Sequence, residues 1–181
     1  MKTKLPIWLC LVISLALVIF GLVFGTVRGF HDEKAQVTAC LESENGLLDV
    51  LGYRGADGLN LSVVAKRHLA AGDEDLAALE AASRALQSSQ TSLEEKKAAD
   101  VRLETAAAAV SRKLKSSDSF QQSQRDQKYL DMLTGDMSNL SGSAAAETYN
   151  QAAQSFNDQL NTPVIGVFAR WMGVKPCPLY Q

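Results

Sequence analysis

The feature that most constrains this 181-residue chain is an uncharged run near its start. From Leu5 to Val27 there is no Asp, Glu, Lys or Arg, and most positions are Leu, Ile, Val or Phe. As a helix, these 23 residues would extend about 34 Å, which is enough to cross a bilayer core of about 30 Å. The sequence therefore predicts a transmembrane helix over 5–27 in contact with membrane lipid, preceded by a short flank at 1–4.

A cleaved signal peptide is the alternative interpretation of the same run. The apolar region of a signal peptide usually spans about 7–15 residues and ends at a cleavage site with small residues. This run is longer, and Phe24-Gly25-Thr26 is a poor cleavage site. Cys10 follows Trp8-Leu9 and lies too early to serve as a lipoprotein acceptor. We therefore expect a retained, single-pass anchor.

Basic residues on both sides of the run bear on its orientation. Lys2, Lys4 and the terminal amine precede it, whereas Arg28 and Lys34 follow it. The positive-inside rule then favours a cytoplasmic N-terminus and a body on the periplasmic or extracellular side. Because the margin is only one or two charges, a cytoplasmic body stays open as the alternative.

Two glycines inside the run, Gly21 and Gly25, are spaced as a GxxxG pair. Such a pair lets a second membrane helix approach closely, although glycine is also common in membrane helices generally. The pair makes self-association, or contact with another membrane protein, a hypothesis to test.

Composition and periodicity indicate that the rest of the chain is helical. Hydrophobic residues make up 46% of the chain and aromatic residues only 7%, which suits a packed helical core better than a β-sandwich. Leu79, Leu86 and Leu93 recur every seven residues, in the manner of a coiled coil, and no stretch alternates with a period of two. We expect an all-α fold in which residues 28–161 form an antiparallel bundle of about four long helices.

Glycines and turn residues set the expected helix boundaries. The expected helices cover about 30–53, about 59–70, a long stretch from Asp73 to a turn at 116–119, and a second long stretch from there to Thr162-Pro163. The glycine-rich stretch at 52–58 is expected to be a loop between the first two helices.

The sequence lacks the residue patterns that nucleic-acid binding, a carboxylate-bridged metal site or nucleophilic catalysis would need. Eighteen basic residues against twenty acidic ones remove the electrostatic case for nucleic-acid binding. Neither His31 nor His68 has the Glu three positions before it that a carboxylate-bridged metal site requires, and both are expected to be solvated rather than to activate a nucleophile. We therefore predict no catalytic, cofactor-binding or metal-binding residues, and a protein that is not an enzyme.

The last segment, 162–181, has a different character. A short helix is expected to carry four apolar side chains on one face and to end before two prolines; these residues are Val164, Phe168, Trp171, Met172, Pro176 and Pro178. We favour an amphipathic tail that caps the open end of the bundle core. The alternative is a segment lying in the bilayer interface with Trp171 at headgroup depth.

Residues near the C-terminus resemble, in order and spacing, the signature of the LemA family. They are Tyr149, Asn150, Phe156, Asn157, Pro163, Ala169, Gly173, Lys175 and Pro176, followed by the aromatic Tyr180. The expected first helix also resembles the start of that family at Gln36-Val37, Leu41, Leu47-Leu48 and Leu51. The resemblance implies a helical bundle anchored in a bacterial inner membrane, with no established enzymatic activity. It also implies a cytoplasmic body, against the charge count.

Asn150 and Asn157 lie seven residues apart and therefore on one face of a helix. Amides in this position can bond to a neighbouring helix and fix its register, or can line a polar ligand site between helices. We favour the first interpretation.

Cys40 and Cys177 would approach each other if the last long helix runs back towards the membrane. In an oxidising compartment a disulfide between them could contribute about 4 kcal/mol by closing a long loop. The alternative is two unrelated thiols.

These observations favour a non-catalytic, membrane-anchored scaffold or interaction module at the bacterial cell envelope. The alternative is a bundle that binds a small molecule or a lipid in a cavity between helices. Alanine runs at 106–109 and 144–146 would allow either tight packing or such a cavity.

Overall fold

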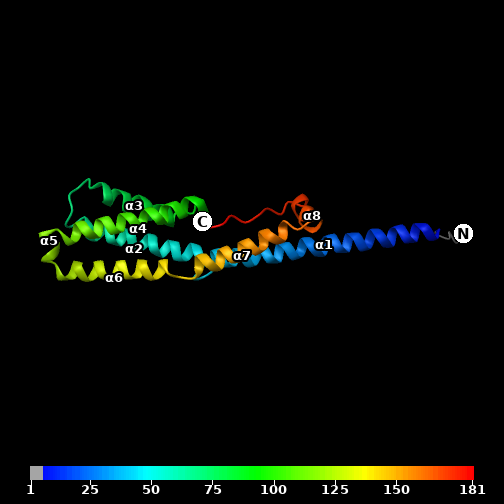
Figure 1. Ribbon diagram of the computed structural model, residues 1–181, viewed down its shortest axis with the longest axis horizontal. Helices are drawn as coiled ribbons and strands as arrows, with labels where there is room; N and C mark the ends of the chain where they lie inside the picture. Colours follow the sequence, from blue (N-terminus) through cyan, green and yellow to red (C-terminus); the bar gives the residue numbers. More distant parts are fainter. Residues whose placement is uncertain (1–5) are drawn as a thin grey trace. The chain divides into compact units, whose positions relative to one another are not determined.

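The structure is a computed structural model that describes residues 6–181, so the expected flank at 1–4 and Leu5 lie outside the described residues. The described chain is all-helical and contains no strand, which confirms the predicted fold class. Its helices, shown in Figure 1, are α1 (Ile7–Glu42), α2 (Leu47–Ala65), α3 (Glu74–Gln87), α4 (Leu93–Lys115), α5 (Asp118–Gln121), α6 (Gln124–Ser141), α7 (Ala145–Leu160) and α8 (Ile165–Trp171).

The chain folds as two compact units that are not consecutive in sequence. The terminal unit contains the described residues up to Thr38 together with Ala152–Cys177. The central unit contains Ala39–Gln151 and Pro178–Gln181. The chain therefore passes from one unit to the other inside α1, inside α7 and again within the tail.

In the terminal unit, α1 continues without a break from the apolar run into the body. The sequence pattern predicted two helices here, separated near residue 28. Gly29 is a weak breaker, because one glycine costs a helix only about 1 kcal/mol and the good helix formers of 33–36 follow within a turn or two. The helix ends at Glu42, just before a turn in which Asn45 adopts a φ of 63°. The apolar part of α1 is long and apolar enough to cross a membrane.

The C-terminal half of α7 lies antiparallel to α1 within the terminal unit (Figure 1). The rings of Phe30 and Phe156 meet edge to face with centroids 6.1 Å apart, and both side chains are buried. After α7 the chain turns sharply into α8, with Val164 at a φ of 71°. A Cβ at position 166 would collide with the carbonyl group of Leu160, so this turn requires Gly166.

In the central unit, α2 packs against α3, α4 and α6, and α3 packs against α4 (Figure 1). The glycine-rich stretch at 52–58 is not the expected loop but the middle of α2. A Cβ at Gly55 would meet the carbonyl oxygen of Ser83, and a Cβ at Gly58 would collide with Ser83 Oγ and Leu103 Cδ1. These two glycines therefore let α3 and α4 approach the backbone of α2 closely.

The two expected long helices are each divided. The first becomes α3 and α4, because Ser92 and Glu95 form a capping box that starts a new helix. The second becomes α5, α6 and α7, with Ser123 capping the start of α6 and a turn at 142–144 before α7. The predicted bundle of about four long helices is therefore wrong in its helix boundaries, although the helical character of these segments is confirmed.

Candidate functional site

The most elaborate set of polar contacts holds the C-terminal tail, residues 174–181, against α7. In the terminal unit, Asn157 Oδ1 accepts from the Cys177 N–H at 2.8 Å and Asn157 Nδ2 donates to the Cys177 carbonyl at 2.8 Å. In the central unit, Asn150 forms the same two bonds with Tyr180, at 2.8 and 2.9 Å. Each amide thus binds the tail as a neighbouring peptide group would. The asparagines fix the register of the extended tail, not that of a neighbouring helix as expected.

The spacing of the asparagines matches the spacing of the residues they bind. Seven residues of α-helix rise about 10 Å, and three residues of extended chain span about 9–10 Å. Asn150 and Asn157 are seven residues apart in α7, whereas Cys177 and Tyr180 are three apart in the tail. The spacing in the sequence is therefore compatible with one such contact in each unit.

The prolines of the tail occupy positions that need no backbone donor. Pro176 and Pro178 flank Cys177, whose N–H is used by Asn157. Pro178 contributes only its carbonyl group, which accepts from the Tyr149 hydroxyl at 2.6 Å. This alternation of proline and donor residue was the sequence signal for a bound extended tail, and the helix-based interpretation missed it.

The side chain of Tyr180 is buried inside the central unit, to which this residue belongs. The residue is 5% exposed, and its hydroxyl donates to Asp100 Oδ2 at 3.0 Å. Asp100 in turn forms an ion pair with the buried Arg54, whose Nε lies 3.0 Å from Asp100 Oδ1. The Lys97 ammonium lies 4.7 Å from the centroid of the Tyr180 ring. Burial and the negative charge of Asp100 raise the pKa of Tyr180, which keeps the phenol a neutral donor.

The remaining signature residues shape the chain between α7 and the tail. Pro163 lies in the turn before α8, and Ala169 is fully buried. Gly173 adopts a φ of 89° at the end of α8, and the Val174 N–H donates to the Ala169 carbonyl at 3.0 Å. These are features of a left-handed helix end, which favours glycine. Lys175 is exposed immediately before Pro176.

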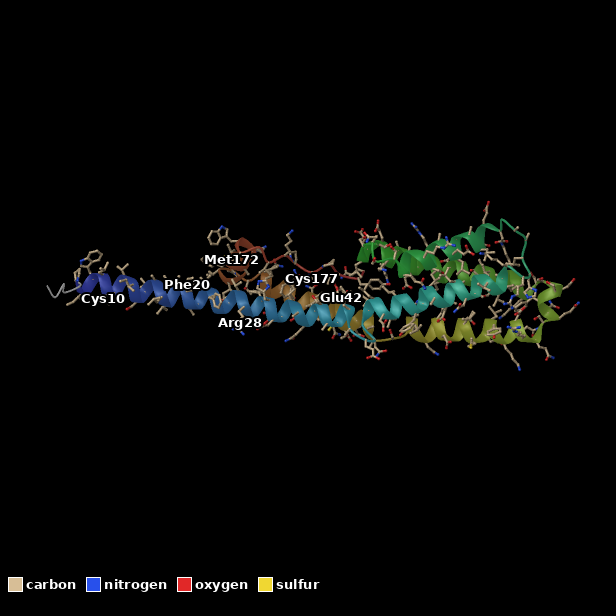
Figure 2. All side chains as sticks on the ribbon, turned by 180° about the vertical axis from the view of Figure 1, so that it is seen from behind. Cys10, Phe20, Arg28, Glu42, Met172 and Cys177 are labelled. Carbon is tan, nitrogen blue, oxygen red and sulfur yellow. The ribbon has the colours of Figure 1, made fainter. Side chains whose placement is uncertain are left out.

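The apolar face expected to cap the bundle core is not buried. The exposed fractions of its side chains are 67% for Val164, 45% for Phe168, 80% for Trp171 and 52% for Met172. The four exposed side chains give the expected cap no support, and the cap stays a prediction. The apolar part of α1 is exposed in the same way, and Figure 2 shows its side chains between Cys10 and Phe20 projecting from a single helix.

The cysteines and the glycine pair carry no contact that decides their predicted roles. Cys10, Cys40 and Cys177 are free thiols, and the pairing of Cys40 with Cys177 stays a prediction. Burial raises the pKa of the Cys177 thiol. A Cβ at Gly21 or Gly25 would meet no other atom of the described chain within 4 Å, so this face of α1 is open.

His68 is not solvated as expected, because its side chain is only 8% exposed. Its Nε2 lies 2.8 Å from Asp126 Oδ2 and its Nδ1 lies 3.0 Å from Ser119 Oγ. Arg67 Nη1 bonds to the other oxygen of Asp126 at 2.6 Å. The hydrogen bond from His68 is the largest of the contacts that lower the pKa of Asp126. This cluster joins the turn that follows α2 to α5 and α6. His31, in contrast, is exposed.

The order Ser119–His68–Asp126 is that of a nucleophile, a base and an orienting carboxylate. Here, however, the carboxylate is shared with Arg67, and Ser117 Oγ lies 3.0 Å from Ser119 Oγ. The ring of Phe120 packs edge-on against the imidazole, with centroids 5.4 Å apart. Because these contacts connect three elements, we assign the cluster to the stability of the central unit.

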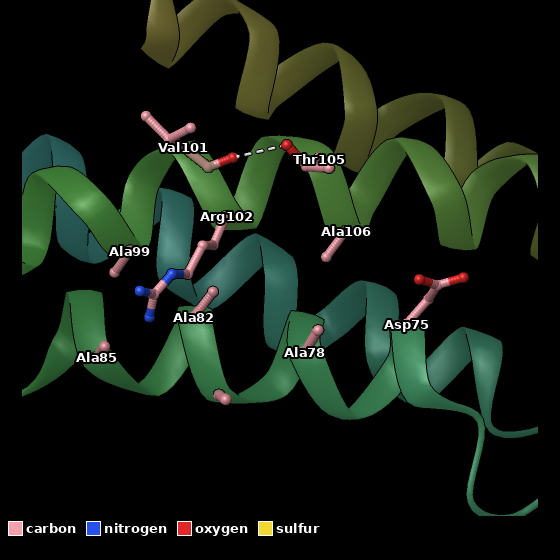
Figure 3. Close-up of a pocket in the computed structure, with 10 residues that line it drawn as sticks. Asp75, Ala78, Ala82, Ala85, Ala99, Val101, Arg102, Thr105 and Ala106 are labelled. Atoms are coloured by element: carbon pink, nitrogen blue, oxygen red, sulfur yellow. Dashed lines mark hydrogen bonds between the residues drawn. The ribbon is translucent and has the colours of Figure 1, made fainter.

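An alanine-lined hollow of about 480 Å³ lies between α3 and α4 (Figure 3). Its lining consists of Asp75, Ala78, Ala81, Ala82, Ala85, Ala99, Val101, Arg102, Thr105 and Ala106. The Arg102 side chain reaches across from α4 towards α3 (Figure 3). Ala106 belongs to one of the two alanine runs noted in the sequence, so that run does border a hollow. Among residues 6–181, no group of three His, Cys, Asp or Glu side chains is placed to hold a metal.

Comparison of the chain with protein-family models, curated proteins and solved structures found no match. The resemblance to the LemA family therefore stays a prediction from the residues that carry it.

Proposed function

We propose that this protein is a non-catalytic, membrane-anchored interaction module of the LemA type in a bacterial inner membrane. In this proposal α1 is a single-pass anchor, and the central unit presents surfaces to protein partners. Contact of the anchor with a second copy or with another membrane protein, through the open face at Gly21 and Gly25, belongs to the same proposal.

The observation that carries the proposal is the exposed apolar surface of α1. Between Ile7 and Phe24, twelve large apolar side chains are each 46% to 81% exposed. Each square ångström of apolar surface left in water costs about 25 cal/mol, whereas a bilayer core of about 30 Å accommodates such a helix without that cost. A bilayer is therefore the environment that best fits this surface.

The exposed apolar residues of α8 support a second contact with the membrane. Trp171 and Phe168 are exposed next to Arg170, and Lys175 follows. Aromatic and basic side chains together suit the headgroup region, where an amphipathic segment lies in the plane of the interface. We therefore prefer the interfacial interpretation of this segment over the cap.

Membrane insertion is tested by alkaline carbonate extraction of membranes containing the full-length protein. We expect the protein to resist extraction, and a variant with Leu15→Arg and Ile19→Arg to be released. Both substituted side chains are exposed, so the variant tests insertion rather than folding. Release of the unsubstituted protein by carbonate would refute an inserted anchor.

The side of the membrane is tested by thiol labelling of intact cells. In a Cys10→Ser variant treated first with a mild reductant, a membrane-impermeant maleimide reports on Cys40 and Cys177, which are both partly buried. Our proposal places the body outside the cytoplasm, in line with the charge count, and expects labelling without permeabilisation. Labelling only after permeabilisation would place the body in the cytoplasm, as the LemA resemblance implies.

Binding of a small molecule or lipid is a second candidate, favoured by the hollow between α3 and α4. Its volume of about 480 Å³ lies within the range of about 300–1,000 Å³ typical of ligand sites. Native mass spectrometry of the purified protein would detect a retained ligand. Ala81→Leu should displace it, whereas Ala77→Leu, an exposed alanine of α3 outside the hollow, should not. Equal occupancy in the two variants would exclude the hollow.

A further inference from the structure

We infer that the face formed by α2 and α6 docks an acidic protein segment that inserts an apolar side chain. This inference rests on the proposed interaction function and names the chemistry of the partner. Two adjoining hollows of about 290 and 430 Å³ define the face. They share Arg125, Tyr129 and Met132.

The face combines a firm apolar floor with exposed apolar side chains. Val64 and Leu133 are both 4% exposed and belong to the packed interior. Above them, Val63 is 53%, Tyr129 39% and Met132 50% exposed. Tyrosine, methionine and arginine are enriched at protein interfaces, where an aromatic or apolar anchor fills a hollow on the partner surface.

Both helices present this face at regular helical spacing. Asn60 and Val63 follow one another along α2 and Arg67 lies in the turn just after it, while Arg125, Tyr129 and Met132 follow one another along α6. The Arg125 guanidinium lies 5.5 Å from the centroid of the Tyr129 ring. This contact holds the ring in place before a partner arrives, which lowers the entropy lost on binding.

The charge of the face identifies the partner chemistry. Arg67, Arg125 and Lys128 line the two hollows, and no Asp or Glu does. Arg67 is partly neutralised by Asp126, whereas Arg125 and Lys128 form no ion pair among residues 6–181. A positive face on a chain with more acidic than basic residues favours an acidic partner and speeds its association.

The shape favours a protein segment over the other two occupants. Separate concave hollows receive individual side chains, whereas a bilayer surface presents no side chains to fill them. In a second copy of this chain, the acidic group at the start of α3 is already engaged and is not free to dock here. Lys113 lies 2.7 Å from both Asp73 and Asp75.

Site-specific photocrosslinking of the full-length protein in membranes of the source organism tests this inference. A photoreactive phenylalanine analogue replaces Met132, and the same analogue replaces Val101 on α4 as a control of similar exposure, 54% against 50%. We expect an adduct from position 132 whose crosslinked peptide, identified by mass spectrometry, is acidic around an apolar residue.

Charge reversal makes the test specific for the proposed chemistry. Arg125→Glu with Lys128→Glu should lower the adduct yield about tenfold or more, as loss of close charge pairs does. Arg112→Glu with Lys115→Glu, on exposed positions of α4, changes the net charge equally and should leave the yield unchanged. If the first double variant fails to fold, a fall in wild-type yield with rising salt concentration tests the same point.

The outcomes separate this inference from the proposed function. An adduct from position 132 with lipid, or with a second copy, overturns the inference. A protein adduct from position 101 but none from 132 also overturns it and leaves the interaction function standing. Absence of any protein adduct from either position, in crosslinker variants that insert normally, counts against both.

Discussion

The two units of this chain meet their surroundings in opposite ways. Among residues 6–181, the terminal unit carries eighteen of the twenty-three large apolar side chains that are exposed, and the central unit carries five. The seven acid–base pairs found in the same part of the chain, in contrast, all lie within the central unit. The exposed surface of the terminal unit is therefore much more apolar than that of the central unit, which carries the paired charges.

The comparison teaches that one continuous helix can carry an exposed apolar surface over one half and packed core residues over the other. α1 carries twelve exposed apolar residues over its first half and then contributes Phe30 and Val37 to a buried contact. The helix is unbroken between these two parts. Substitutions of equal size in the two units should therefore have unequal effects on stability.

The largest difference is expected for a leucine deletion in each unit. Leu61→Ala removes a fully buried side chain from the central unit and should lower the free energy of unfolding by about 3 kcal/mol. Leu15→Ala, at 62% exposure in α1, should leave it unchanged in detergent. Urea unfolding followed by circular dichroism measures both. Equal losses would show that the two units do not differ in this way.

A second difference is expected within α2, between two glycines. Gly58→Ala introduces a Cβ that collides with Ser83 and Leu103 and should cost about 1–3 kcal/mol. Gly52→Ala meets no atom within 4 Å and should instead stabilise the helix by about 0.5–1 kcal/mol. Thermal unfolding of the two variants should shift in opposite directions. A stabilising effect at both positions would argue against close packing of α3 and α4 on α2.

A third comparison uses the paired hydrogen bonds that Asn157 forms in the terminal unit and Asn150 forms in the central unit; we call each pair an asparagine clamp. Asn157→Ala and Asn150→Ala each leave a tail N–H and carbonyl unpaired, at a cost of about 1–3 kcal/mol per variant when the tail stays in place. Amide hydrogen exchange should accelerate at Cys177 in the first variant and at Tyr180 in the second. Gln181→Ala, which is exposed, serves as the control. Unchanged exchange in both variants would contradict the clamps.

The smallest expected effect is the pH dependence of the central unit. Because His68, Ser123 and Arg67 lower the pKa of Asp126 below its ordinary 3.8, this carboxylate stabilises the folded state above about pH 4. The stabilisation is lost as the pH falls through the lowered pKa. The difference in unfolding free energy between the unsubstituted protein and Asp126→Asn should therefore shrink on acidification. A difference that grows below pH 4 would reverse the assigned sign.

Features set by local sequence could be predicted, and features set by distant contacts could not. The apolar run, the all-α class and the short helix before Pro176 follow from residues adjacent in the chain. The break between α3 and α4 was also readable, because Ser92 and Glu95 have the spacing of a capping box. The capping box lies at the end of the repeat formed by Leu79, Leu86 and Leu93, where the seven-residue spacing stops.

The missed features depend on partners far along the chain. His68 bonds to residues 51 and 58 positions away, so no local pattern distinguishes it from a surface histidine. The glycines of α2 resemble a loop until the packing of α3 against them is known. The asparagines were correctly placed on one face, but their partner is an extended segment rather than a helix, and periodicity does not reveal it.

The two prolines beside Cys177 disfavour misaligned binding of the tail to Asn157. If the tail slipped by one residue in either direction, Asn157 would face Pro176 or Pro178 in place of Cys177. Neither proline has an N–H to offer, so both misalignments would leave the amide oxygen unpaired at a cost of about 1–3 kcal/mol. Pro176 and Pro178, which form no bond to the Asn157 amide, therefore help to select the one alignment in which Cys177 does.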